Sequence, residues 1–203
     1  MTLQVQILAF DDVEALDLAG PYEVFTTATR MGLRAQPNAA PLFNVVCVAR
    51  DNTTVRARAG LAIVPEHSFA NAPKADVLIV PGGVTTQAEA CPATLAWIAQ
   101  TSAQAQITAS VCTGAFLLAE SGVLAPDEHV TTHWEDIADL RQRFPRLQVD
   151  EAPRWVDNGR IVTSAGISAG IDMSLHLVAR LASPALAERT ARQMDYPYRP
   201  EPI

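Results

Sequence analysis

The stretch Gln106-Ile107-Thr108-Ala109-Ser110-Val111-Cys112-Thr113-Gly114 decides the fold of this 203-residue chain. Residues 106–111 are predicted to form a strand, and residues 115–121 are predicted to form a short helix that Gly122 ends. The segment from Ser110 to Gly114 has the layout of a nucleophile elbow, the sharp strand-to-helix turn that presents a reactive side chain, with cysteine at its centre. The sequence therefore predicts a strand, a sharp turn at Cys112 and a helix.

A turn of this kind gives Cys112 a physical reason to be reactive. The residue at the turn is held in strained backbone geometry, so small neighbours such as Ser110 and Gly114 are needed around it. The helix that follows directs free N–H groups and its positive dipole end at the sulfur, which favours thiolate over thiol. The same amides could bind an oxyanion. The alternative is that Cys112 is a small buried hydrophobic residue.

Segments of strand and helix type alternate along the rest of the chain. Apolar runs predict strands at residues 2–10, 43–49 and 77–80, and residues 54–58 and 61–65 around Gly60 predict a short hairpin or arm. Helix-spaced apolar residues predict helices at residues 16–30, with Pro21 near the helix start, and at 92–103, 168–182 and 184–194. Residues 31–42, which contain two prolines, are expected to form a loop, and the proline-rich tail from about residue 195 is expected to be irregular.

The pair Asn158-Gly159 lies between two apolar segments, residues 155–156 and 161–163. Asn-Gly between apolar runs is typical of a β-hairpin with a type I′ turn, in which both central residues have positive φ. We therefore expect a hairpin here, with Asn158 and Gly159 both in the left-handed region.

Alternating strands and helices predict an α/β fold with a doubly wound, mostly parallel sheet and helices on both faces. We expect a single domain over residues 1–203, a length that buries roughly 70% of the surface of the unfolded chain. In such sheets ligands bind beyond the carboxyl ends of the strands. Four segments with unusual residues should meet there: 11–21, 81–85, 112–114 and 166–170.

Further groups near these segments have both a chemical and a structural interpretation. Gly82 and Gly83 end a strand, where backbone amides could approach a ligand, or where the chain simply turns. Asp17, flanked by leucines, could exchange a proton with a thiolate or cap a helix. His133 could act as the base for Cys112, or it could be a partly buried histidine satisfied by threonine hydroxyls.

Composition excludes several classes of function. The net charge of −7 and the pI near 5.0 give no attraction for phosphate backbones, and the basic residues are scattered, so we expect no nucleic-acid partner. No apolar stretch is long enough to cross a bilayer, and the N-terminus has no features of a signal peptide. Three cysteines without ligand spacing and four isolated histidines predict no metal site. A cytoplasmic protein is expected, with Cys47 in the core and Cys91 in a loop.

Taken together these residues resemble the ThiJ/PfpI superfamily, which has the class I glutamine amidotransferase-like, flavodoxin-like fold. Within it, the chain is most similar to isonitrile hydratases and to the amidotransferase-like domains of AraC-type regulators. The likeness spans most of the chain and is carried by five stretches: Leu16-Asp-Leu-Ala-Gly-Pro-Tyr-Glu-Val24, Val80-Pro-Gly-Gly83, Ser110-Val-Cys-Thr-Gly114, Thr131-Thr-His-Trp134 and Ala165-Gly-Ile-Ser-Ala-Gly-Ile-Asp172.

The resemblance implies roles for the catalytic residues. Cys112 matches the nucleophile, Asp17 matches the acidic residue that hydrogen-bonds it, and Thr113 matches a threonine that orients the site. Gly83 would supply an oxyanion amide. His133 lies in the region of the amidotransferase histidine, although hydratases also carry Thr-Thr-His-Trp, so it could be catalytic or structural. The remaining residues expected at the pocket are Gly82, Val84, Trp134 and Ile167.

The chain departs from the hydratase pattern after Gly83, where Val84-Thr85-Thr86 replaces a further Pro-Gly, so the shape of the substrate stays open. It ends at Ile203 without a helix-turn-helix, which argues against the DNA-binding role of the regulators. The resemblance implies a cofactor-free lyase that hydrates an isonitrile, a small electrophile, to an N-substituted formamide, working as a homodimer with its active site near the interface. The alternatives are a glyoxalase-like hydratase of α-oxoaldehydes, and a thiol sensor in which Cys112 oxidises to a sulfinic acid.

Overall fold

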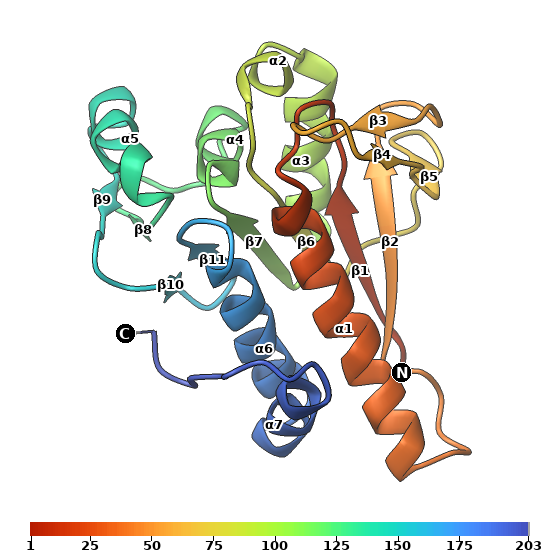
Figure 1. Ribbon diagram of the computed structural model, residues 1–203. Coiled ribbons are helices and arrows are strands. Elements are labelled where there is room, and N and C mark those ends of the chain that lie inside the picture. Colours follow the sequence, from red (N-terminus) through yellow and green to blue (C-terminus); the bar gives the residue numbers. More distant parts are fainter. Residues whose placement is uncertain (203) are drawn as a thin grey trace.

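The computed structural model describes residues 1–202 and builds them around a seven-stranded sheet (Figure 1). The strand order is β10-β11-β7-β6-β1-β2-β5, and every neighbouring pair is parallel except β10 and β11. The strands are β1 (Leu3–Leu8), β2 (Phe43–Ala49), β5 (His67–Ser68), β6 (Val77–Val80), β7 (Ile107–Val111), β10 (Trp155–Asp157) and β11 (Ile161–Ser164). The mostly parallel sheet predicted from the sequence is confirmed.

Helices cover both faces of this sheet. On one face α1 (Ala15–Ala35), α6 (Ala169–Leu181) and α7 (Pro184–Gln193) pack against one another (Figure 1). On the other face lie α3 (Pro92–Gln104) and α4 (Gly114–Glu120), together with the short α2 (Thr86–Glu89). The connections from β1 to β2 and from β6 to β7 step in opposite directions across the sheet, and right-handed crossovers therefore place their helices on opposite faces.

Strand β6, at the centre of the sheet, is apolar throughout because both of its faces are covered. In β6 all four residues are buried, and Val77, Ile79 and Val80 have no exposed surface. A strand with one wet face would alternate polar and apolar residues, so continuous runs indicate burial on both sides. This is why the limits of β2 and β6 agree with the runs seen in the sequence.

Outside the main sheet the chain forms smaller elements. The predicted arm is present as an antiparallel pair, β3 (Val55–Arg56) and β4 (Ala62–Ile63). A second pair, β8 (His129–Val130) and β9 (Gln148–Val149), is parallel and encloses the 3₁₀ turn η1 (Trp134–Asp136) and α5 (Ile137–Arg143). These elements contribute to a separate apolar cluster that includes Phe116 and Leu140. No helix among residues 1–202 is long and apolar enough to cross a membrane.

Three local predictions were wrong. Helix α1 continues to Ala35, well into the segment expected to be a loop, because Met31 is still buried on its inner face. Pro21 lies inside this helix rather than near its start, where its missing N–H leaves the carbonyl of Asp17 without the usual helical donor. In the hairpin only Gly159 has positive φ, at 84°, and Asn158 N–H donates to the carbonyl of Ile161 at 2.9 Å. This is the pattern of a type II′ turn, in which the first central residue alone is left-handed.

The strand order creates a topological switch point between β1 and β6. Crossovers leave these neighbouring strands in opposite directions, so the segments that follow them diverge and leave a crevice beyond their carboxyl ends. The start of α1 follows β1, the pair Gly82-Gly83 follows β6, and Cys112 follows β7, the next strand along. Residues 166–170 follow β11, which pairs in parallel with β7, so all four segments expected to meet lie at the same edge of the sheet.

Candidate active site

Cys112 is held in the backbone conformation of an elbow. Its φ is 55°, a left-handed value that few residues other than glycine adopt. Its N–H donates to the carbonyls of Ser164 (3.1 Å) and Ala165 (3.2 Å), and its own carbonyl accepts from the Thr132 hydroxyl at 2.9 Å. A Cβ at Gly114 would lie 2.1 Å from the carbonyl oxygen of Val80, so only glycine lets the turn approach β6 this closely. These hydrogen bonds and this close packing together hold Cys112 in its strained backbone conformation.

The thiol of Cys112 is buried, with 7% of the residue exposed. Burial, followed by the charge of Asp17, raises the pKa of the thiol to about 12, although the N–H groups of Thr113 and Ile167 act in the opposite direction. The expectation that the turn would favour the thiolate is therefore wrong. The helix behind Cys112 is short, and its dipole is outweighed by loss of water around the sulfur.

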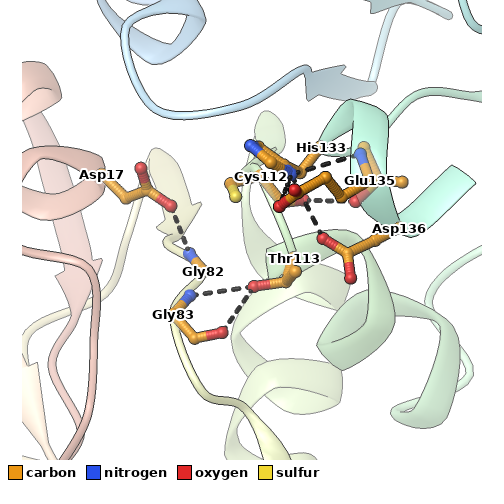
Figure 2. A network of polar contacts seen from close by, with 9 residues as sticks. Asp17, Gly82, Gly83, Cys112, Thr113, His133, Glu135 and Asp136 are labelled. Atoms are coloured by element: carbon orange, nitrogen blue, oxygen red, sulfur yellow. Dashed lines mark hydrogen bonds and ion pairs between the residues drawn. The ribbon is translucent and has the colours of Figure 1, made fainter. Parts of the chain in front are cut away.

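Asp17 lies in the first turn of α1 and is completely buried. Its Oδ2 accepts the N–H of Gly82 at 3.1 Å, Oδ1 has no hydrogen-bond partner within residues 1–202, and the carboxyl group as a whole lies beside the Cys112 side chain (Figure 2). Burial raises the pKa of this carboxyl to about 7, and the Gly82 N–H limits the rise. The interpretation of Asp17 as a helix cap is wrong, because Glu14 occupies the N-cap position.

Thr113 fastens the elbow to the turn that follows β6. Its Oγ1 accepts the N–H of Gly83 at 2.9 Å and donates to the carbonyl of the same residue at 2.9 Å (Figure 2). Thr113 was expected to orient the site, and its hydroxyl bonds both backbone groups of Gly83. The Gly83 amide is consequently not free to bind an oxyanion, which corrects that expectation. A Cβ at Gly82 would lie 2.5 Å from Thr113 Oγ1 and 3.0 Å from Asp17 Oδ2, so glycine is required there.

His133 packs against the fourth predicted segment rather than against the thiol. A Cβ at Gly166 would lie 2.1 Å from its Cδ2, which shows how closely the ring covers the backbone before Ile167. Ile167 has positive φ, 39°, and in this conformation its N–H faces the Cys112 sulfur. Within residues 1–202 no hydrogen bond joins His133 to Cys112; its Nδ1 accepts the N–H of Glu135 at 3.3 Å instead. His133 is placed to support the Ile167 amide.

The cavity in front of Cys112 has a volume of about 220 Å³. Its lining is unexpectedly charged: Glu14, Arg58, Gly83, Cys112, Thr113, His133, Glu135, Asp136 and Ile167. The two carboxylates after His133 could have been found because they directly follow the Thr131–Trp134 stretch, whereas Arg58 comes from the arm and carries no signal in the sequence. Val84 and Trp134 are exposed, at 43% and 73%, and do not line this cavity.

The other cysteines and histidines form no second centre of this kind. Within residues 1–202 no group of three or more histidine, cysteine or carboxylate side chains is arranged to hold a metal ion. Cys47 is buried in β2, as predicted, and burial raises the pKa of its thiol to about 12. Cys91 is half-buried just before α3, and hydrogen bonds from Thr94 lower the pKa of its thiol.

Comparison with known proteins agrees with this geometry. A model of the DJ-1/PfpI family matches residues 3–180. An isonitrile hydratase from Pseudomonas putida is 34% identical over 197 residues, which cover 97% of this chain and 79% of that protein. The HTH-type transcriptional regulator GbdR of Pseudomonas aeruginosa is 30% identical over 176 residues, but these cover 87% of this chain and 46% of the regulator.

Solved structures show the same fold. A THiJ/PfpI family protein from Pseudomonas syringae superposes with a TM-score of 0.84 at 30% identity, covering 98% of this chain and 77% of that one. Drosophila melanogaster DJ-1beta superposes with a TM-score of 0.81 and covers 98% and 100% of the two chains, at 17% identity. The second likeness concerns the fold alone.

Proposed function

This chain belongs to the DJ-1/PfpI family, and from that premise we propose that it is a cysteine-dependent isonitrile hydratase, which converts R–NC and water to an N-substituted formamide. The observation that carries the proposal is the position of the completely buried Asp17 carboxyl group beside the Cys112 thiol, which itself lines a cavity. The 34% identity to an isonitrile hydratase over 97% of the chain supports the choice of reaction.

The first step forms a covalent thioimidate. An isonitrile is electrophilic at its terminal carbon, and the Cys112 sulfur attacks this carbon as Asp17 accepts the thiol proton. The new S–C bond leaves the electron pair on the former isonitrile carbon, and Asp17 returns the proton there. The product of this step is R–N=CH–S–Cys112, with no net gain or loss of protons. Because the pKa of Asp17 is raised to about 7, its carboxyl group exchanges protons readily near neutral pH.

The second step hydrolyses this intermediate. Asp17, again ionised, takes a proton from a water molecule as the water oxygen attacks the thioimidate carbon, and it passes this proton to the nitrogen. The resulting R–NH–CH(OH)–S–Cys112 collapses to the formamide and the free thiol, with the hydroxyl proton passing through Asp17 back to sulfur. The N–H groups of Thr113 and Ile167 face the sulfur and stabilise the negative charge that it carries as it leaves.

Thr113 has a positioning role in this scheme. It fixes Gly83 through two hydrogen bonds, and the neighbouring Gly82 N–H in turn holds Oδ2 of Asp17. The carboxyl group is thereby held beside the thiol. Holding an acceptor and a nucleophile in place before the substrate arrives removes an entropy cost from the barrier.

Capture of the intermediate tests this proposal. During turnover of an isonitrile, an acid quench followed by mass spectrometry should show one substrate mass added to the Cys112 peptide. The adduct should form more slowly in Asp17→Asn, because the first step needs this carboxylate to accept the thiol proton. A quenched enzyme that forms formamide without ever carrying substrate on Cys112 would contradict covalent catalysis.

A second candidate function is ligand sensing without turnover. It is favoured by the 30% identity to the regulator GbdR over 87% of this chain. For a sensor, small electrophiles should raise the melting temperature of the protein while no product appears. Formation of lactate from methylglyoxal would instead indicate the related hydration of an α-oxoaldehyde.

A further inference from the structure

The cavity in front of Cys112 is acidic. Its lining contains three carboxylates and one arginine, and Ile167 is its one large apolar side chain. A small hydrocarbon substrate would gain little from such walls, because apolar transfer requires apolar surface to bury. The charged residues of the lining therefore indicate which kind of substrate the cavity binds, whereas Cys112 and Asp17 indicate only the reaction.

The two walls of the cavity differ in their charge balance. Glu14 and Arg58, one negative and one positive residue, belong to one wall, where the backbone N–H of Arg58 donates to the carbonyl of Val13, the residue before Glu14. Glu135 and Asp136 belong to the other wall, and within residues 1–202 neither forms an ion pair with an arginine or lysine. Both carboxylates lie near the His133 ring, whose Nδ1 is 3.8 Å from Glu135 and 3.4 Å from Asp136.

The arginine nearest in the chain to this second wall has other partners. Arg141 shares a neighbouring hollow with Glu135, but it pairs with Glu151 and donates to the carbonyl of Val149. Trp134, which is 73% exposed, precedes the two carboxylates, and an aromatic face attracts cations. The wall formed by Glu135 and Asp136 thus has an unbalanced negative charge with an indole beside it.

An independent observation lies on the other side of the nucleophile. Asp17 Oδ1 is completely buried and has no hydrogen-bond partner within residues 1–202, and the Cys112 side chain lies between this carboxyl group and His133 (Figure 2). A buried polar oxygen without a partner is costly in a native protein and is characteristic of a site that a ligand completes. Cys112 is therefore flanked by carboxylates on both sides.

We propose that the substrate of this site is a small electrophile with a positively charged group, and that Glu135 and Asp136 bind the cation while Cys112 attacks the electrophilic carbon. The identity of the electrophile rests on the proposed function, whereas its charge does not. A protonated or quaternary amine a few bonds from the reacting carbon has the required chemistry. The cavity of about 220 Å³ limits such a molecule to a short chain.

The same binding event would activate the nucleophile. The pKa of the Cys112 thiol is raised by burial, by Asp17 and, less strongly, by Asp136. A cation seated beside Asp136 cancels part of this negative potential and favours the thiolate. The thiol would then stay protonated before the substrate binds, and it would ionise more readily once a cationic substrate is bound.

Charged thiol reagents test the proposal without any assumption about the reaction. Methanethiosulfonates transfer an R–S group to a thiolate and release methanesulfinate; the trimethylammonium-ethyl reagent is cationic and the sulfonatoethyl reagent is anionic. Rates of Cys112 labelling are measured by peptide mass spectrometry in a Cys91→Ser background and divided by the rates with a free small thiol. We expect the cationic reagent to be favoured at least tenfold, the factor that corresponds to one charge pair at short range in a partly solvated site.

Variants test whether Glu135 and Asp136 cause the preference for the cationic reagent. Glu135→Gln with Asp136→Asn should reduce the ratio severalfold, whereas Glu188→Gln with Glu201→Gln, which removes the same charge from exposed positions outside the cavity, should leave it unchanged. Equal rates for the two reagents, a preference that both double variants reduce equally, or a Cys112 that neither reagent reaches would each overturn the proposal.

A matched pair of isonitriles separates this inference from the proposed function. The compounds 3-(trimethylammonio)propyl isocyanide and 4,4-dimethylpentyl isocyanide have nearly the same shape and differ in charge. Hydration with kcat/KM at least tenfold higher for the cation supports both ideas. Hydration that favours the neutral compound overturns the charge inference and leaves the hydratase. Failure to hydrate either, with cationic labelling still favoured, overturns the hydratase and leaves the acidic site.

Discussion

The carboxyl group of Asp17 and the thiol of Cys112 lie side by side in a position that water barely reaches, with 0% and 7% of the two residues exposed. Burial raises the pKa of the carboxyl to about 7 and that of the thiol to about 12, so ionisation of the pair begins at Asp17. The active form at neutral pH is a thiol beside a carboxylate. Attack on a substrate then requires proton transfer from sulfur to Asp17, and the two groups titrate as one coupled system.

Replacement of Asp17 by asparagine should remove the proton acceptor and keep the shape. We expect kcat/KM to fall by about 10²–10⁴-fold, the usual contribution of a general base. For the natural protein, kcat/KM should rise with pH through about 7 and then level off, since Asp17 must be ionised to act. The asparagine variant should lack this rise. A pH profile that is identical in both proteins would remove Asp17 from the mechanism.

The same substitution should stabilise the fold, and more so at high pH. The pKa of Asp17 is about 7 in the folded protein and near 3.8 in the unfolded chain, so between these values the unfolded chain loses its proton first and the free energy of unfolding decreases as pH rises. Each pKa unit corresponds to about 1.4 kcal/mol. Asp17→Asn has no such decrease. Its gain in melting temperature over the natural protein should therefore be small at pH 4 and largest at pH 8, and an equal gain at both would contradict the raised pKa.

Thr113→Val should separate shape from hydrogen bonding. Valine keeps the branched side chain but leaves the N–H and carbonyl of Gly83 without their partner, and a buried group left unpaired costs about 1–3 kcal/mol. We expect a loss of stability of this order and a reduction of kcat/KM by at least tenfold, because Gly82 no longer holds Asp17 firmly. Thr113→Ser retains the hydroxyl and should restore most of both. A serine variant as impaired as valine would show that the methyl group, not the hydroxyl, matters.

Gly166→Ala tests whether His133 positions the Ile167 amide. Gly166 does not have positive φ, so alanine suits the backbone, but its Cβ would lie 2.1 Å from His133 Cδ2. We expect kcat/KM to fall by at least tenfold as the Ile167 N–H moves away from the sulfur. His133→Ala removes the clash, so the double variant should be more active than Gly166→Ala alone. Effects that simply add would show that the two residues act independently.

A glycine in open space provides the control for that experiment. Gly32 lies in α1, and nothing lies within 4 Å of the position that the methyl group of an alanine would take there. Gly32→Ala should therefore raise stability by about 0.5–1 kcal/mol, through the lower entropy of the unfolded chain, and leave turnover unchanged. Differential scanning calorimetry and the same kinetic assay check both statements.

The sequence predicted the sheet well because its central strands are covered on both faces. Continuous apolar runs have few other structural explanations, and the limits of β2 and β6 were predicted to the residue. Residues 123–150 received no elements, although they contain β8, η1, α5 and β9. Two-residue strands and a seven-residue helix with exposed arginines have too little periodicity to be recognised.

At the site, the side chains were easier to predict than the backbone. The sequence placed Cys112, Asp17 and Thr113 together through the elbow and the family resemblance. It could not show that the Gly83 amide is occupied by Thr113, nor that an isoleucine with φ of 39° presents its N–H to the sulfur. From the helix dipole the sequence predicted a stabilised thiolate. This was wrong, because burial removes water from around the sulfur and raises the pKa of the thiol, and burial depends on tertiary packing. Neither the direction of one backbone N–H group nor the burial of one thiol can be recognised from the identity of the side chain at that position.

The central claim is tested most directly by following isonitrile consumption and formamide formation by NMR, with purified, fully reduced protein and with Cys112→Ala as the control. We predict one formamide for each isonitrile consumed, at a rate proportional to enzyme concentration, and no conversion above background with the alanine variant. Folding of both proteins is checked by circular dichroism. A folded, reduced natural protein that forms no formamide from either the cationic or the neutral isonitrile, or an alanine variant that retains the activity, would contradict the account.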